Sequence, residues 1–482
     1  MTKGLLNPIR VTPWPVKGLY LFLLLGLLLC LNNTWLGYSF WIDELFSVST
    51  AELPFVEQWR AMLNDVHPPL YQLIFKCWIL LVGNSEPGVR LLSLLLTLAA
   101  LWRVMQWSTK LNPWAQWAVI AIFSTSFLFA FYAQEARSYA LNLYLATLLT
   151  TSFIDYDGIS RRPLIKIVAL ALLLSLSHYF GLLLSGSILL VLLFSAEKNI
   201  RNTATIILGG LLCLIWPLIH LANGLRSHTS WIVVDGPLDT LQISFRAMLP
   251  LETSVLLLCA ALITVALTLL ALFKPSRSQS KPDEARPALI KLVLVLVIML
   301  AFVASLDLLN PISTERNFIV LLPVLAVMLG CVTERLSQRG QSRWWLLILV
   351  VLIESWSAVN LSRSYTLMSL KWAPQQNWKA TAQYAIDNDS ANKKIYYLRN
   401  SDSEDTERVF NFYIKKLSDY KLSAERVYMS QLPTLTRPAQ LIFGQANQND
   451  LNRILRESNL KPEAVFFPKQ SLGSTTGVIL FP

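Results

Sequence analysis

The sequence is dominated by apolar runs long enough to cross a lipid bilayer. A hydrocarbon core of about 30 Å needs roughly 20 helical residues. About 11 segments meet or approach that length: residues 16–35, 87–107, 113–132, 138–155, 164–177, 180–195, 204–222, 251–273, 288–307, 317–333 and 344–360. Because 54% of the 482 residues are hydrophobic and only 15% are charged, soluble domains cannot bury so much apolar surface. The sequence therefore predicts an α-helical polytopic membrane protein.

One further apolar stretch, "DVHPPLYQLIFKCWILLVG" at residues 65–83, is predicted not to span. At 1.5 Å per residue, a helix over 67–83 reaches about 25 Å, which is short of the hydrocarbon core. Its polar residues Gln72 and Lys76 are four apart and so share one helical face. The two prolines suit a first helical turn. We expect an amphipathic helix in the outer membrane interface, with Lys76 facing a cavity.

The positions of the basic residues support this topology. With 67–83 kept out of the membrane, 18 Lys and Arg residues lie in inner loops, and only 7 lie on the outer side before residue 361. This imbalance follows the positive-inside rule. It predicts a multi-pass protein of the cytoplasmic (inner) membrane whose N-terminus lies on the inner side. The net charge of +11 therefore reflects topology, and no basic stripe with interleaved aromatic residues indicates nucleic-acid binding.

Ionisable residues that are unusual for a membrane protein gather at the outer ends of the predicted spans. They are Asp43, Glu44, Asp65, His67, Glu135, Arg137, His178 and Arg316. Such groups are costly near the bilayer and usually mark function. The sequence therefore predicts a polar site at the outer face.

Several of these residues also have a structural interpretation. Arg137 is a candidate snorkelling anchor, although Gln134, Glu135 and Tyr139 around it form a larger polar cluster than anchoring requires. Further structural roles left open are a solvated loop start for Asp43 and Glu44, a packed hydrogen-bonded position for His178, a cap for Arg316 and snorkelling for Lys76.

Several short motifs occur in an order that resembles the bacterial GT-C glycosyltransferases. They are "WIDELFS" after the first span, "DVHPPLYQ", "YAQEARSYAL", and "NPISTERNF" before a late span ending in "VLLPVLAVMLG". The nearest branch looks like the one that contains protein O-mannosyltransferases and lipid A aminoarabinose transferases, a glycosyltransferase family 39-like branch. The resemblance covers roughly residues 15–335. It implies a GT-C fold with outer juxtamembrane helices.

The resemblance also implies an activity. Members of this family move a sugar from a polyprenyl-phosphate carrier, such as undecaprenyl phosphate, to an acceptor at the outer face, with inversion. Carried over residue by residue, Asp43 and Glu44 correspond to the family's catalytic acid pair, and His67 to the residue at the start of its surface helix. Glu135 and Arg137 correspond to the acidic and basic positions of its second motif. Some relatives have a lysine or an acid in place of His67, which leaves its contact to phosphate or metal open.

The chemistry of sugar transfer needs these residue types. A base must take the proton of the acceptor hydroxyl, and cations must stabilise the departing phosphate. We expect Asp43 to be the base, with Glu44 either holding it or positioning the acceptor. The planar fork of Arg137 suits a phosphate.

Other residues are expected to assist the donor phosphate. Lys76 and Arg316 would add positive charge, while Tyr139, Asp65 and His178 are supporting residues. His67 would bind the phosphate directly or, together with Glu135, hold a divalent metal ion. No ligand spacing in the sequence decides for or against a metal ion.

The tail from 361 to 482 differs in character from the rest of the chain. It holds 16 of the 41 basic residues and has no 20-residue apolar run. Helices are predicted at 378–386 and 449–457, and strands at 393–399, 439–445 and 475–481. We therefore expect a transmembrane catalytic domain over 1–360, with its first outer loop at 36–86, and a small outer-face (periplasmic) α/β domain over 361–482. Its role is left open between covering the site, gripping the acceptor and structural support.

The sequence leaves rival functions open. A transporter or flippase of lipid-linked sugars commonly has repeated halves and binds at mid-membrane, whereas here the polar residues gather at one face. A non-catalytic envelope assembly factor would have no need of the outer acid pair. The prediction is therefore a glycosyltransferase of EC class 2.4, a hexosyl- or pentosyltransferase, acting within membrane lipid. The acceptor, whether lipid, glycan or protein, is left open.

Overall fold

The computed structural model describes residues 24, 26–28, 30, 31, 38–195, 199–223, 232–248, 254–273, 285–337, 343–372, 377–388, 393–399, 406–446, 448–459, 461–468 and 475–482. Most of the predicted first span, 16–35, lies outside these residues. The chain divides into two compact units. One comprises Met1–Cys30, Leu95–Ala130 and Tyr139–Arg363, and the other comprises Leu31–Leu94, Phe131–Ser138 and Ser364–Pro482.

Helices occupy the positions of the apolar runs from residue 87 onward. They are α5 (Glu86–Ser108), α6 (Pro113–Thr125), α7 (Phe127–Tyr132), α8 (Tyr139–Ile154), α9 (Arg161–Ser175), α10 (Tyr179–Ser195), α11 (Ile200–Cys213), α12 (Ile215–Ala222), α13 (Pro237–Met248), α14 (Ser254–Phe273), α15 (Ala285–Leu309), the 3₁₀ helix η1 (Glu315–Leu321), α16 (Leu322–Ser337) and α17 (Arg343–Trp372). Every predicted span after the first thus overlaps one helix or a consecutive pair.

Among the described residues, four helical segments are long and apolar enough to cross a membrane. They are Glu86–Ser108, Ile200–Ala222, Ala285–Leu309 and Glu315–Ser337. The chain is therefore a membrane protein. The total of about 11 spans stays a prediction.

The predicted span at 113–132 is broken at Ser126, whose extended backbone (φ −59°, ψ 136°) ends α6. The break releases backbone groups that would otherwise need partners in an apolar environment. The side chain of Asn360 on α17 accepts a hydrogen bond from the Phe127 N–H (2.9 Å), and Ser357 pairs with the Thr125 hydroxyl (3.0 Å). Polar residues of α17 therefore make the break tolerable.

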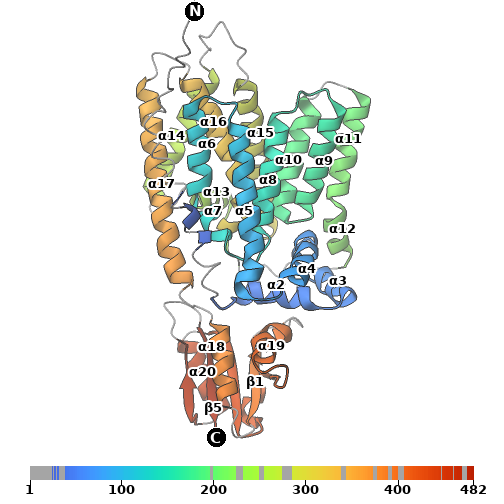
Figure 1. Cartoon of the computed structure of the whole chain (residues 1–482), viewed down its shortest axis with the longest axis vertical. Coiled ribbons are helices and arrows are strands. Elements are labelled where there is room, and N and C mark those ends of the chain that lie inside the picture. The colour runs from blue at the N-terminus through green and yellow to red at the C-terminus, as the bar shows by residue number, and fades with distance from the viewer. Residues whose placement is uncertain are drawn as a thin grey trace, which may run out of the picture. The chain divides into compact units, whose positions relative to one another are not determined.

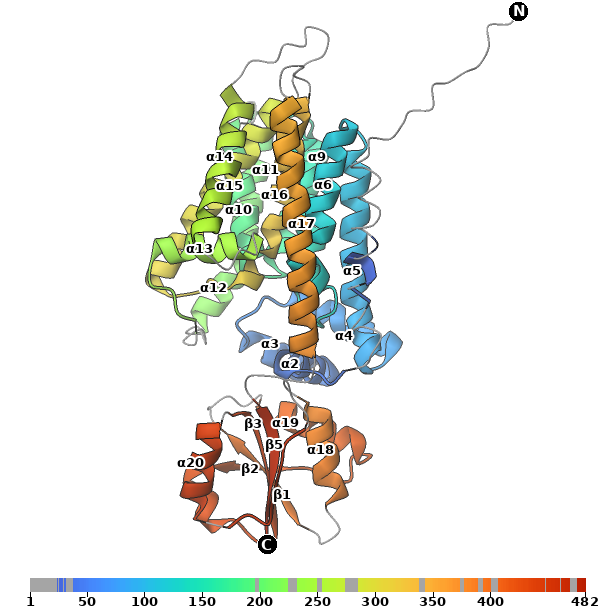
Figure 2. The same cartoon turned by 90° about the vertical axis from the view of Figure 1, so that its left-hand side faces the viewer.

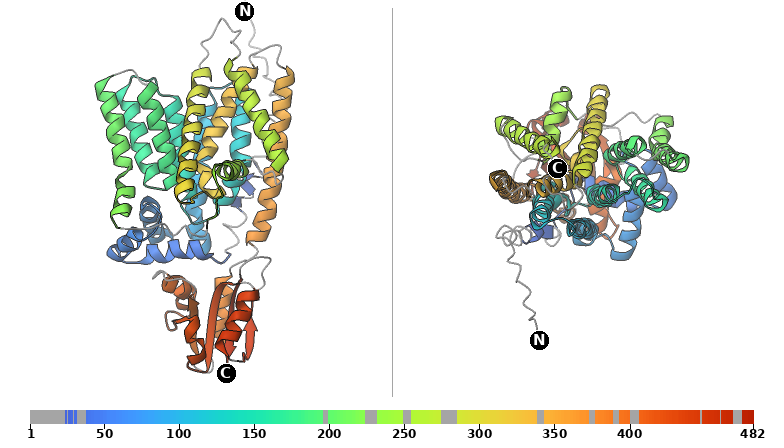
Figure 3. Two further views of the ribbon diagram at one scale, coloured as in Figure 1. Left: turned by 180° about the vertical axis from the view of Figure 1, so that it is seen from behind. Right: turned by 90° about the horizontal axis from the view of Figure 1, so that it is seen from above.

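In the first unit, α9, α10 and α11 stand side by side, as Figure 1 shows from one direction and Figure 3 from behind. The buried helix α16 packs against α6, α8 and α15. Its approach to α6 is close at Gly330, where an added Cβ would lie 2.4 Å from Val119 Cγ2.

The second unit contains three short helices, α2 (Ile42–Glu52), α3 (Phe55–Leu63) and α4 (Leu70–Val82), and α2 packs against α4. The helix predicted within 67–83 is confirmed by α4, which starts after the two prolines. It ends at Gly83, whose φ of +78° favours glycine. Whether α4 lies in a membrane interface stays a prediction.

The second unit also contains a five-stranded sheet with the order β2-β1-β3-β5-β4. The strands are β1 (Lys394–Arg399), β2 (Glu425–Tyr428), β3 (Ala439–Ala446), β4 (Ala464–Phe466) and β5 (Thr475–Phe481), accompanied by α18 (Trp378–Asp387), α19 (Thr406–Leu417), the 3₁₀ helix η3 (Met429–Thr434) and α20 (Gln448–Ser458). β1 is parallel to β2 and β3, whereas β5 is antiparallel to β3 and β4. The predicted strands and helices of the tail match these elements.

Both faces of the sheet are covered, because α20 lies on one face and α18 with α19 on the other (Figure 2). The strands accordingly bury side chains that point to either face of the sheet. Leu441 and Phe443 pack in the cluster that includes α20 residues, while Ile442 is buried on the opposite face.

Candidate active site

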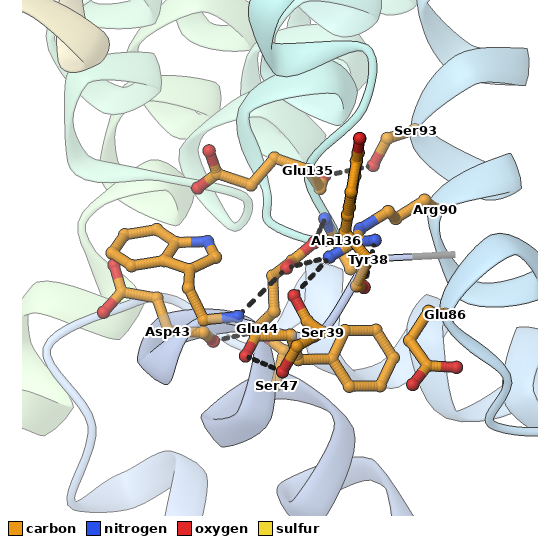
Figure 4. Close-up of polar contacts among 12 residues, drawn as sticks. Tyr38, Ser39, Asp43, Glu44, Ser47, Glu86, Arg90, Ser93, Glu135 and Ala136 are labelled. Atoms are coloured by element: carbon orange, nitrogen blue, oxygen red, sulfur yellow. Dashed lines mark hydrogen bonds and ion pairs between the residues drawn. The ribbon is translucent and has the colours of Figure 1, made fainter. Parts of the chain in front are cut away.

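The first turn of α2 carries the acid pair Asp43 and Glu44. Glu44 is fully buried, and its carboxylate is held by several donors (Figure 4). Oε1 accepts from Arg90 Nε (2.8 Å) and from the Ala136 N–H (2.9 Å), and Oε2 accepts from Arg90 Nη2 (2.6 Å). Glu44 therefore ties α2 to α5 and to the turn at 133–138.

Arg90 is the partner that the sequence analysis did not select. Its fully buried guanidinium also donates to the carbonyl oxygens of Tyr38 (2.8 Å) and Ser39 (3.2 Å). An arginine four residues after Glu86 inside an apolar run was a signal that could have found it, because such residues rarely lie in a membrane helix without a partner.

Asp43 is placed differently from Glu44. It is only half-buried, and its backbone carbonyl accepts from the Ser47 hydroxyl (3.1 Å) and from Arg137 Nη1 (3.3 Å). Figure 4 shows the carboxylates of Asp43 and Glu135 extending to the side away from Arg90. Asp43 is therefore the more exposed member of the acid pair.

Arg137, His67 and Asp65 form a chain of polar contacts. Arg137 Nη2 lies 3.4 Å from His67 Nε2, and His67 Nδ1 lies 3.3 Å from Asp65 Oδ1. When Nδ1–H donates to Asp65, Nε2 of the neutral ring is left to accept from Arg137. Arg137 also donates to the Ser47 hydroxyl (3.1 Å), so this chain is attached to α2.

The charges along this chain keep Asp65 ionised. Burial alone would raise the pKa of the Asp65 carboxyl. The pKa nevertheless falls below its usual value because the positive charge of a protonated His67 ring and its hydrogen bond, the charge of Arg137 and the Val66 N–H together outweigh burial. An anionic Asp65 fixes the orientation of the imidazole.

Glu135 lies in the tight turn between α7 and α8 and is almost fully buried. Its backbone carbonyl accepts from the Ser93 hydroxyl (2.6 Å) and from the Arg137 N–H (2.8 Å). Burial, together with the charges of Glu44 and Glu135, raises the pKa of the nearby Tyr71 phenol well above its usual value, although Arg137 opposes this. Tyr71, which the sequence analysis did not select, is therefore a neutral hydroxyl beside these charges.

Lys76 caps a helix in this structure. Its ammonium donates to the carbonyl oxygens of Ala51 (2.9 Å) and Leu53, at the C-terminal end of α2. A cation at this end of a helix is favourable, because the last carbonyls have no partners within the helix. Lys76 thus supports α2, and its expected contact to phosphate stays a prediction.

The remaining predicted residues belong to the first unit, where they form a second cluster. The guanidinium of Arg316 lies 5.8 Å from the centre of the Tyr139 ring. The centre of the His178 ring lies 6.0 Å from the centre of the same Tyr139 ring. His178 Nδ1 accepts from the Phe180 N–H (3.1 Å) at the start of α10, so it also closes the break between α9 and α10. This bond agrees with the structural interpretation of His178 as a packed, hydrogen-bonded residue.

No group of three or more His, Cys, Asp or Glu side chains within the described ranges is arranged to hold a metal ion. Glu135 and His67 stay the candidates that the sequence predicts.

Comparison with known proteins gives the fold class. No protein-family model matches the chain, and no curated protein matches it. Two solved structures are similar over nearly the whole length, covering 97% of this chain and 98% of theirs. They are ArnT from Cupriavidus metallidurans in the apo state (TM-score 0.56, 11% identity) and ArnT from the same organism bound to undecaprenyl phosphate (TM-score 0.55, 13% identity).

At this level of identity, the likeness concerns the fold. The chain has the fold of ArnT.

Proposed function

We propose that this protein is a membrane glycosyltransferase that moves a sugar from a polyprenyl-phosphate carrier to an acceptor at the outer face of the cytoplasmic membrane. The observation that carries the proposal is the placement of Asp43. A half-buried carboxylate is held on α2 by the buried Glu44–Arg90 pair, beside the chain of Arg137, His67 and Asp65. The shared fold with ArnT, one of whose structures contains undecaprenyl phosphate, adds support.

In the proposed reaction, the Asp43 carboxylate takes the proton of the acceptor hydroxyl. The acceptor oxygen attacks the anomeric carbon, the bond from that carbon to the phosphate oxygen breaks, and polyprenyl phosphate leaves. Direct displacement of this kind inverts the anomeric centre. Glu44 does not share in the proton transfer, because its oxygens are occupied by Arg90 and Ala136.

Arg137 and His67 are proposed to hold the donor phosphate. The guanidinium of Arg137 stabilises the negative charge that grows on the leaving oxygen. His67, oriented by Asp65, offers Nε2 on the same side as Arg137 and, when protonated, donates to a phosphate oxygen.

A carrier lipid requires that the site meet the membrane, and we propose that α3 and α4 lie in the outer interface. Large apolar side chains are exposed on both helices: Phe55 (59%) and Val56 (61%) on α3, and Leu80 (77%) and Leu81 (80%) on α4. Exposed apolar residues gathered in this way suit contact with lipid. The N-terminus is then inside, and the α/β part of the tail is on the outer side.

Mass spectrometry of envelope lipids and glycans tests the function. Cells that lack the chain should lose one sugar-bearing species, and the wild-type protein should restore it. Asp43→Asn should fail to restore it while still binding undecaprenyl phosphate. Asp387→Asn, a matched control at an exposed position of α18, should behave as wild type.

Two results would contradict the proposal. If Asp43→Asn restores the sugar-bearing species as well as wild type does, the protein acts as an envelope assembly factor. If the protein carries the lipid-linked sugar across the membrane without any change in the sugar-bearing acceptors, it acts as a transporter.

A further inference from the structure

Helix α19 of the tail contacts the segment that leads into α2. The Tyr413 hydroxyl accepts a hydrogen bond from the Phe40 N–H (2.8 Å) and donates to Glu86 Oε1 (3.1 Å). Tyr413 and Phe40 are both buried, and 373 residues separate them in the sequence. One phenol thus satisfies a buried backbone donor and binds a carboxylate at the start of α5.

Aromatic packing strengthens this contact. The Phe40 ring lies 5.9 Å from Phe412 and 6.1 Å from Tyr413, measured between ring centres, and the Arg90 guanidinium lies 5.3 Å from the centre of the same ring. Phe40 is therefore packed against α19 and against the arginine that binds Glu44.

Two lysines of the tail contact Ser39 in this segment and the residues at the start of α5. The backbone N–H of Lys379 donates to the Ser39 hydroxyl (3.2 Å), and its ammonium lies 3.1 Å from Glu86 Oε1. The ammonium of Lys416 donates to the Asn84 carbonyl (2.9 Å). Both α18 and α19 thus contact the residues that flank the acid pair.

These contacts are continuous with the candidate active site. Arg90 binds the carbonyls of Tyr38 and Ser39 in addition to the Glu44 carboxylate (Figure 4), and Glu44 binds the Ala136 N–H. Phe40 is three residues before Asp43. A displacement at Phe40 would therefore pass directly to the start of α2.

We propose that the α/β part of the tail is a component of the active site, and that Tyr413 is a positioning residue that fixes the Asp43 carboxylate. This inference rests on the proposed function. Without the Tyr413 hydroxyl, the buried Phe40 N–H has no acceptor and the segment 38–40 shifts. Small misplacements of a reacting group strongly reduce turnover, while the phosphate contacts of Arg137 and His67 persist.

The test uses the full-length protein with Tyr413→Phe, which keeps the ring and removes only the hydroxyl. Tyr384→Phe is the matched control, because Tyr384 lies on α18 stacked on Phe466 (ring centres 4.0 Å apart), away from these contacts. Glu86→Gln is a second variant. It gives the Tyr413 hydroxyl a weaker, uncharged acceptor and removes the charge that Lys379 binds, so it loosens the same contacts while the Tyr413 side chain stays in place.

Three readouts are compared at equal protein levels. Tyr413→Phe should restore about tenfold less sugar-bearing product than wild type, with an unchanged affinity for undecaprenyl phosphate. Hydrogen exchange of the amides at 38–44 should become faster, whereas exchange in β3 and β5 should not change. Glu86→Gln should show the same pattern in weaker form, and the control should show none.

The outcomes separate this inference from the proposed function. If exchange at 38–44 and product formation both match wild type, Tyr413 does not position the site. If affinity for the carrier lipid falls together with product, the variant has a general structural defect and the positioning role is refuted. If Tyr413→Phe does not fold, Glu86→Gln decides in the same way. If the wild-type protein itself makes no product, the proposed function fails, and the exchange measurement still decides whether α19 fixes this segment.

Discussion

The buried pair of Glu44 and Arg90 makes the strongest quantitative prediction. Replacing Arg90 by Met should lower the free energy of unfolding by about 3–5 kcal/mol, because the Glu44 carboxylate is left buried without its cation. Arg90 donates two hydrogen bonds to Glu44 and one each to the carbonyls of Tyr38 and Ser39. Their loss leaves Glu44 with the N–H groups of Ala136 and Trp41.

A double variant separates the charge pair from simple packing. Glu44→Gln with Arg90→Met removes both charges, so it should lose less stability than the sum of the two single changes, with a coupling energy of about 1–3 kcal/mol. Lys394 and Glu425 provide a surface pair 3.9 Å apart, with side chains 51% and 63% exposed. Replacing Lys394 by Met should cost no more than about 1 kcal/mol.

The measurement is equilibrium unfolding in mixed detergent micelles, followed by tryptophan fluorescence. A loss below about 1 kcal/mol for Arg90→Met, equal to that of the surface control, would refute the reasoning. It would mean that water or another cation reaches Glu44.

Three further predictions concern the neighbouring residues. Arg137→Lys should weaken binding of undecaprenyl phosphate about tenfold or more by calorimetry, because an ammonium cannot replace the guanidinium fork; unchanged affinity would remove Arg137 from the phosphate site. Asp65 has a lowered pKa, so its stabilising contribution is present above its unfolded value of about 3.8 and is lost as the pH falls through the lower folded value. Asp65→Asn should therefore unfold with a weaker dependence on pH in acid than wild type, and parallel curves would contradict this. Lys76→Met should lower stability by about 1 kcal/mol through the loss of the α2 cap, with binding of undecaprenyl phosphate retained; selective loss of that binding would instead favour a phosphate contact.

Much of the fold follows from local patterns in the sequence. Apolar runs locate most helices from α5 to α17, the two prolines and Gly83 delimit α4, and short apolar runs rich in β-branched and aromatic residues locate β1, β3 and β5. These features depend on neighbouring residues, so one sequence is enough to predict them. The break at Ser126 was missed, because the group that satisfies it, Asn360, lies 233 residues from Phe127.

The site was predictable in its members but not in their roles. Motif order pointed to Asp43, Glu44, His67 and Arg137, which the second unit brings together. Hydropathy cannot show which acid is buried, and so the difference between Asp43 and Glu44 depends on Arg90, a residue 46 positions away.

The strand order of the tail has a consequence for biogenesis. β5 lies between β3 and β4, although it is the last of the five to be synthesised. A nascent polypeptide therefore inserts its helices long before this sheet closes. We expect a translation product that stops ahead of Thr475 to reach the membrane with this sheet unfolded. Cellular proteases could then recognise the unfolded segment and degrade the product.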